Sequence, residues 1–117
     1  MSIIILLFGH WFADFVMQTD DMAVNKSHSN SALAKHCLVY IFILIMFVYF
    51  TFPDKSLEFY NNVFAINLIG HLIIDFTTSR LNTWLWKKGM RHWFFVSIGF
   101  DQFLHIAILL WSVGLLK

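Results

Sequence analysis

Four long apolar segments, separated by polar stretches, constrain this chain more than any other feature of its sequence. They cover residues 2–18, 36–52, 62–81 and 93–116. A helix needs about 20 largely apolar residues to cross the hydrocarbon core of a bilayer, with a range of about 17 to 25. Each segment falls within that range. The sequence therefore predicts an all-α, integral membrane bundle of about four transmembrane helices.

The composition favours a lipid environment. Hydrophobic residues make up 59% of the 117 residues and charged residues only 13%, whereas charged residues make up about 25% of a typical soluble protein. A soluble domain of this size has too little interior to bury so much apolar surface. We therefore expect a single transmembrane domain, residues 1–117, whose main partner is the lipid bilayer. The net charge of +1 argues against nucleic-acid binding, which needs a basic surface.

The connections between the segments predict where helices end. Residues 53–56, Pro-Asp-Lys-Ser, predict a turn after the second helix, and the polar residues 19–31 predict a loop after the first. The third helix is expected to continue beyond the membrane to Lys87 and Lys88. Gly89 would cap it, because glycine readily adopts the left-handed conformation that ends a helix.

Basic residues predict the orientation of the helices. Six of them follow the first and third apolar segments, namely Lys26, Lys35, Arg80, Lys87, Lys88 and Arg91. Only Lys55 and Lys117 lie on the other side. Because basic residues favour the cytoplasmic side of a membrane, we expect these two connections in the cytoplasm and both termini outside.

A short motif occurs twice in the chain. Residues 8–15 read Phe-Gly-His-Trp-Phe-Ala-Asp-Phe and residues 69–76 read Ile-Gly-His-Leu-Ile-Ile-Asp-Phe. The repeat predicts two tandem helical hairpins, roughly residues 1–55 and 60–117, and internal repeats often place a shared site at their interface. Gly9 and Gly70, just before the two histidines, are expected to permit close approach of neighbouring helices.

Three pairs of His and Asp residues lie within the apolar segments. They are His10 with Asp14, His71 with Asp75 and, in reversed order, Asp101 with His105. Residues four apart share one face of a helix. Because the last helix runs in the opposite direction, the reversal predicts one layer of histidines near mid-bilayer and one layer of aspartates ~6 Å nearer the cytoplasm. Four further polar residues are predicted near these layers or at the cytoplasmic mouth: Gln18, His36, Arg80 and Gln102.

This set of side chains favours metal chemistry. Ionised groups at membrane depth are costly unless they are paired, and they are usually functional. Neutral imidazole together with carboxylate suits Zn²⁺, Mn²⁺ or Fe²⁺. We therefore predict a divalent metal ion held by the six residues, with the aspartates as the catalytic groups. With two ions, one aspartate would bridge them. The alternative is that these residues form only interhelical hydrogen bonds.

Three stretches also resemble a known family. They are GHWFADFVMQTDDMAVNKS, HLIIDFTTSRL and WKKGMRHWFFVSIGFDQFLH, and together with the four-helix layout they resemble a bacterial family of small membrane proteins, domain of unknown function 3307. This resemblance covers nearly the whole chain and implies a four-span protein of the bacterial inner membrane, without a settled activity. The chain is more loosely similar to membrane-bound metal-dependent hydrolases, which also carry His and Asp on transmembrane helices.

The leading hypothesis is a membrane-embedded metal-dependent hydrolase that acts from the cytoplasmic leaflet. A metal-bound water, its pKa lowered toward ~7, would be the nucleophile. The basic residues at the cytoplasmic mouth, Arg80, Lys87, Lys88 and Arg91, suit an anionic or phosphorylated lipid-like substrate. A second hypothesis is a transporter or channel subunit that moves protons or metal ions through the same site, which would require a homo-oligomer. A third is a scaffold or accessory protein without catalysis.

Overall fold

The structure is a computed structural model that describes residues 1–116. Lys117, which the sequence analysis places on the outer side, lies outside the described residues. Helices make up nearly all of the described chain, which contains no strand: α1 (Ser2–Trp11), the π-helical segment η1 (Phe12–Val16), α2 (Asp20–Asn25), α3 (Asn30–Thr51), α4 (Leu57–Lys87) and α5 (Arg91–Ser112). The prediction of an all-α fold is confirmed.

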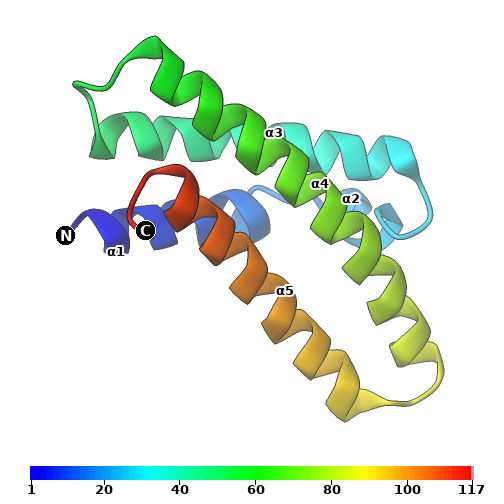
Figure 1. The fold of residues 1–117 in the computed structure, drawn as a ribbon. Coiled ribbons are helices and arrows are strands. Elements are labelled where there is room, and N and C mark those ends of the chain that lie inside the picture. The colour runs from blue at the N-terminus through cyan, green and yellow to red at the C-terminus, as the bar shows by residue number, and fades with distance from the viewer. Residues whose placement is uncertain (117) are drawn as a thin grey trace.

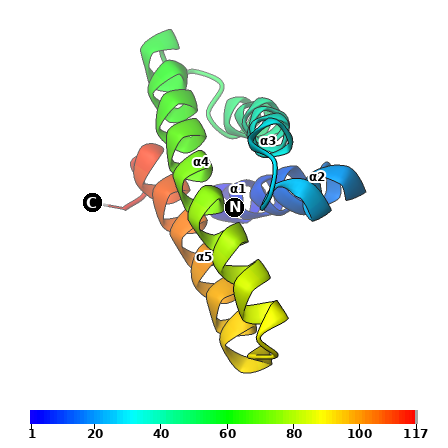
Figure 2. The same ribbon diagram turned by 90° about the vertical axis from the view of Figure 1, so that its right-hand side faces the viewer.

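The helices form two layers. Helices α4 and α5 are an antiparallel hairpin, and α1 lies alongside α3 (Figure 1). In Figure 2, where α3 is seen almost along its axis, α4 and α5 run across the view, so the two layers cross at a wide angle. Helix α4 contacts α3, and α1 contacts α5. The interior of the bundle is therefore enclosed by α1, α3, α4 and α5.

Three helices, α3, α4 and α5, are long and apolar enough to cross a membrane. Helix α1 and η1 continue one another but together reach only about 22 Å at 1.5 Å per residue, which is less than the ~30 Å hydrocarbon core of a bilayer. The fourth crossing thus stays a prediction. Large apolar side chains on the outer surface are at least 60% exposed, among them Phe42, Phe50, Ile73, Phe103 and Trp111. Such a surface is compatible with a membrane protein.

Serine hydroxyls cap the starts of α3 and α4. The Ser56 hydroxyl accepts a hydrogen bond from the Phe59 amide at the start of α4, and the Ser29 hydroxyl accepts one from the Ala32 amide at the start of α3. Each cap satisfies an amide that has no partner within its own helix. Because Ser29 caps α3, this helix begins six residues before the predicted apolar segment 36–52.

Glycines end α4 and follow α5. Gly89 has a φ of +72°, its amide donates to the Trp86 carbonyl, and the next amide, of Met90, donates to the Leu85 carbonyl. This is the Schellman arrangement, so the predicted cap of the third helix is confirmed. Gly114, with a φ of +78°, stops α5 at Ser112, before the predicted end at residue 116.

Two glycines allow close helix contacts, as their positions before His10 and His71 predict. A Cβ on Gly9 would lie 2.5 Å from Cγ of Phe47 on α3, and a Cβ on Gly70 would lie 2.9 Å from Cδ1 of Ile108 on α5. The two contacts differ in kind. The Phe47 atoms belong to the rigid base of a ring, whereas Cδ1 is the movable tip of the Ile108 side chain.

We expect Gly9→Ala to lower the free energy of unfolding by about 1–3 kcal/mol, because α1 must move away from the Phe47 ring. Gly70→Ala should be nearly neutral, because Ile108 can rotate and alanine favours the helix by about 1 kcal/mol. Thermal unfolding of both variants in detergent measures the difference. Equal effects of the two substitutions would contradict the close approach of α1 to α3.

Candidate metal centre

A π-helical turn carries the first aspartate. The Met17 amide donates to the Phe12 carbonyl, five residues earlier, at 3.0 Å. Such wide turns within helices are rare and frequently occur at functional sites. This one carries Asp14, whose side chain is buried in the bundle. No sequence signal indicated the wide turn.

The three predicted histidines meet inside the bundle. The rings of His71 and His105 stack with their centroids 4.3 Å apart, and the ring of His10 lies 5.7 Å from that of His105. Tyr40 of α3 belongs to the same layer, because its ring stacks on His71 at 3.8 Å. All four side chains are at most 3% exposed. Helices α1, α4 and α5 thus each contribute one histidine to this layer, and α3 contributes a tyrosine.

A first group of possible metal ligands lies next to this layer. It consists of Asp14, His36, His71 and Asp75, each of which offers one ligand atom within 4.8 Å of the others. His36 Nε2 lies 3.1 Å from Asp14 Oδ1, 3.1 Å from Asp75 Oδ2 and 2.9 Å from His71 Nε2. Two imidazole nitrogens and two carboxylate oxygens, from η1, α3 and α4, therefore face one another. This donor set suits a divalent transition metal.

A second group consists of Asp75, Asp101 and His105. His105 Nε2 lies 3.0 Å from Asp75 Oδ1 and 3.5 Å from Asp101 Oδ1. Asp75 belongs to both groups, and each of its oxygens faces one of them. Oδ2 lies 3.1 Å from His36 Nε2 of the first group, and Oδ1 lies 3.0 Å from His105 Nε2 of the second. A carboxylate that presents one oxygen to each of two sites is suited to bridge two metal ions.

His10 is not part of either group. The Gln102 amide nitrogen donates to Asp14 Oδ2 and Asp101 Oδ2, each at 3.0 Å, so its oxygen, Oε1, is the atom that faces His10 Nε2 at 2.9 Å. An amide oxygen only accepts, so Nε2 must carry the proton. His10 Nδ1 then accepts a hydrogen bond from the Tyr40 hydroxyl at 3.1 Å. With both nitrogens engaged, His10 has no lone pair for a metal ion.

The predicted metal set therefore changes in membership. His36, predicted only as a neighbour of the site, lies within the first group. Gln102 connects Asp14 of the first group to Asp101 of the second by donating to both. Arg80, predicted at the cytoplasmic mouth beside an anionic or phosphorylated substrate, donates to Asn30 Oδ1 at 3.0 Å and stacks on Phe76. The predicted Gln18 lies beside the site, with its Oε1 buried and without a hydrogen-bond partner.

The cation beside Asp75 is Lys26. Its Nζ lies 3.0 Å from Asp75 Oδ2, and its side chain is 21% exposed. Burial alone would lower the pKa of Lys26, but the nearby carboxylates of Asp75 and Asp14 outweigh burial and raise the pKa above its usual value. From the sequence, Lys26 is predicted only to lie in the cytoplasmic connection after the first helix. Nothing in the sequence indicated that the loop after α2 folds back onto α4.

One ammonium faces three carboxylates in this interior. Asp14, Asp75 and Asp101 are each at most 8% exposed, and carboxylates so close together repel one another unless cations compensate them. Asp14 Oδ1 and His71 Nδ1 are also buried without a hydrogen-bond partner of good geometry. A divalent cation would compensate the negative charge of the carboxylates and would give Asp14 Oδ1 a partner. It would also separate the two imidazole nitrogens of His36 and His71, which lie 2.9 Å apart. The buried cluster could therefore hold a metal ion.

Comparison with known proteins returns one family. The family model described as "Protein of unknown function (DUF3307)" matches residues 2–115, so the resemblance expected from the sequence is confirmed. No curated protein and no solved structure matches the chain. The looser similarity to membrane-bound metal-dependent hydrolases stays a prediction.

Lys26→Met should destabilise the metal-free protein by about 3 kcal/mol, because it leaves the Asp75 carboxylate buried without its ammonium partner. Lys35→Met, at an exposed position of α3, is the matched control and should have little effect. Thermal unfolding in the presence of a chelator measures both. Similar unfolding temperatures for the two variants would show that Lys26 does not compensate the cluster.

Proposed function

This chain belongs to the DUF3307 family, and we propose that it is a membrane-embedded metal-dependent hydrolase with two adjoining ion sites. The observation that carries the proposal is the position of Asp75, whose two oxygens face two different groups of buried ligands. Paired ions bridged in this way are a common arrangement in hydrolases of phosphate esters and amides. A carboxylate in a purely structural network would not need histidines beside both of its oxygens.

The residues of the chain have separable roles in this proposal. Asp14, His36 and His71 would hold one ion, Asp101 and His105 the other, with Asp75 shared between them. Divalent ions held there would polarise the scissile group and activate water at neutral pH. Gln102 orients the aspartates of both sites through its two N–H groups, and the contacts of His10 with Gln102 and Tyr40 hold Gln102 in place. Such supporting hydrogen bonds keep ligands in a competent geometry.

We also propose four membrane crossings in a bacterial inner membrane, with both termini outside and with the site entered from the cytoplasm. The basic connections after α1 and α4 support this orientation. So does a largely apolar layer on the outer side of the histidines, in which Asn67 of α4 is the buried polar side chain. Leu6, Leu44 and Leu109, four residues from His10, Tyr40 and His105 respectively, are fully buried. The proposed repeat halves, residues 1–55 and 60–117, would then be two hairpins with the same orientation.

The same apolar layer weighs against a transporter. A pathway for protons or metal ions must continue to the other side of the membrane, and this layer offers three fully buried leucines and one polar side chain, Asn67. The Asn67 amide group is already engaged, because it donates to the Val63 carbonyl and to the Ser112 hydroxyl. The transporter, with its homo-oligomer, and the scaffold are thus the competing outcomes. Metal content separates the scaffold from the other two, and hydrolysis separates the enzyme from the transporter.

Substitution of single ligands tests the shared carboxylate through metal stoichiometry. The wild type should carry two divalent ions per chain, His105→Gln and His71→Gln about one each, and Asp75→Asn none, because Asp75 serves both sites. Asp54→Asn, in the exposed turn before α4, is the control and should keep both ions. Elemental analysis of protein purified without chelators or a His-tag provides the count. A metal-free wild type that gains no thermal stability from Zn²⁺, Mn²⁺ or Fe²⁺ would refute the hydrolase.

His10→Gln separates a supporting role from direct ligation. If His10 only positions Gln102, the variant should keep both ions and bind them about 10- to 100-fold more weakly. Titration of the chelator-treated protein with metal measures this affinity. Loss of one ion per chain would instead make His10 a ligand, as the sequence alone predicted.

Cysteine accessibility tests the orientation. In a Cys37→Ser background, which removes the native buried thiol, Lys87→Cys should react with a membrane-impermeant maleimide only in inside-out vesicles. Lys55→Cys should react only in right-side-out cells. Both positions are exposed in the fold. Labelling of both from one side would contradict the proposed topology.

A further inference from the structure

A cavity of about 450 Å³ adjoins the metal centre on the side of the bundle that carries Lys26 and Lys87. It lies between η1, α2, α4 and α5, and three residues of the metal centre, Asp14, Asp101 and Gln102, form part of its wall. We call it the headgroup cavity. A molecule within it would lie directly beside the aspartates of both ion sites.

Polar atoms without partners line the headgroup cavity. Gln18 Oε1, Ser79 Oγ and Asn82 Oδ1 are buried and make no hydrogen bond, and all three residues belong to its wall. Ser79 as a residue is only 8% exposed. An unsatisfied buried polar atom costs about 1–3 kcal/mol, so a cluster of three beside one cavity indicates a polar ligand there. The Ser79 hydroxyl and the amide N–H groups of Gln18 and Asn82 can donate to a ligand, whereas the two amide oxygens only accept.

The remaining walls combine positive charge with apolar surface. Lys26 and Lys87 bring two ammonium groups to the cavity, while Phe15, Phe94 and Ile98 form an apolar wall from η1 and α5. Phe15 is 46% exposed, so the apolar wall reaches the outer surface of the helices. An anionic group could bind among the lysines while an attached hydrocarbon chain leaves past Phe15 into lipid.

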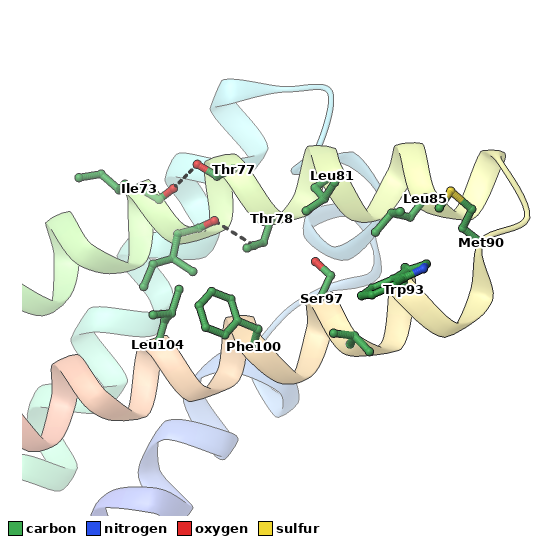
Figure 3. Close-up of a pocket in the computed structure, with 12 residues that line it drawn as sticks. Ile73, Thr77, Thr78, Leu81, Leu85, Met90, Trp93, Ser97, Phe100 and Leu104 are labelled. Atoms are coloured by element: carbon green, nitrogen blue, oxygen red, sulfur yellow. Dashed lines mark hydrogen bonds between the residues drawn. The ribbon is translucent and has the colours of Figure 1, made fainter.

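The other groove of the α4–α5 hairpin provides a comparison. Figure 3 shows it lined by Leu81, Trp93 and Phe100 and their neighbours. The Thr77 hydroxyl there donates to the Ile73 carbonyl of its own helix. The Thr78 hydroxyl lies 2.9 Å from the Ile74 carbonyl and 2.6 Å from Asp101 Oδ1, so it also has a partner. That groove contains none of the unpartnered polar atoms and no lysine among its lining residues. The features that suit a headgroup therefore belong to one face of α4 and not to the other.

We propose that the headgroup cavity binds the phosphate of a lipid phosphate monoester and that this lipid is the substrate of the adjoining metal centre, an inference that rests on the proposed function. In the hydrolysis, the oxygen of a water molecule bonds to phosphorus and the bond from phosphorus to the lipid oxygen breaks. One proton of the water passes to that leaving oxygen and the other stays on the phosphate. The products are the lipid alcohol and inorganic phosphate.

The test uses the full chain in detergent and compares three probes: phosphatidate, phosphatidylcholine and inorganic phosphate. Native mass spectrometry measures retained lipid, and elemental analysis of the same samples measures metal. We expect phosphatidate to bind at least tenfold more tightly than phosphatidylcholine and to be displaced poorly by inorganic phosphate. The metal-loaded protein should release phosphate from phosphatidate.

Two variants alter the cavity without altering a proposed ligand. Asn82→Leu removes an unpartnered polar group and Ile98→Trp fills the apolar side; each should weaken phosphatidate binding about tenfold at unchanged metal content. Thr77→Val and Leu81→Trp make matching changes in the opposite groove and should leave binding unchanged.

The outcomes separate this inference from the function on which it rests. Equal retention of phosphatidate and phosphatidylcholine, or cavity variants that bind like the wild type, would overturn the headgroup cavity while metal content still supports the hydrolase. Inorganic phosphate that competes as well as phosphatidate would assign the site to the free anion and overturn the lipid substrate. Metal-free wild-type protein would refute the hydrolase itself, whatever lipid it retains.

Discussion

The structure depends on how three buried carboxylates are compensated. Asp14, Asp75 and Asp101 lie together in the interior, each at most 8% exposed, and repulsion between them would separate the helices that carry them. The polar groups that contact these carboxylates are histidines from α3, α4 and α5, the Lys26 ammonium and the Gln102 amide. Each of them offers a positive charge or an N–H group to a carboxylate oxygen. These contacts connect all four long helical segments through a single polar cluster.

Hydrogen-bond direction gives the cluster an order that its composition does not show. Carboxylates can only accept, so they determine which end of Gln102 faces them, and Gln102 in turn determines the tautomer of His10. Tyr40 completes the series by donating to His10. The chain of contacts runs from α1 and α5 to α3 and leaves His36, His71 and His105 as the imidazoles beside the aspartates. Four histidines in one interior therefore divide into three candidate ligands and one support.

The two sides of the cluster are chemically different. Toward the termini, fully buried Leu6, Leu44 and Leu109 close the interior. Toward Lys26 and Lys87, the interior opens into a cavity with unpartnered polar atoms. This asymmetry suits a site that takes a substrate from one side and returns its products to the same side. The segment that contains α2 folds back onto this side of the cluster and supplies Lys26, the lysine beside Asp75.

The sequence by itself determined the four apolar helical segments, the spacing of the His and Asp pairs and the end of α4. The prediction of a loop over residues 19–31 was wrong in part, because α2 (Asp20–Asn25) lies within it, capped by the Thr19 hydroxyl. Each of the three determined features is a local property: apolar length, the 3.6-residue period, and the left-handed freedom of Gly89. Tertiary structure decided which of these residues meet. The exclusion of His10, the inclusion of His36, the reach of Lys26 and the two-sided position of Asp75 depend on the rotation of each helix about its axis. They also depend on a loop that folds back and on a π-helical turn. Helical periodicity places two residues on one face but does not say which neighbour that face meets, because only packing between helices determines it.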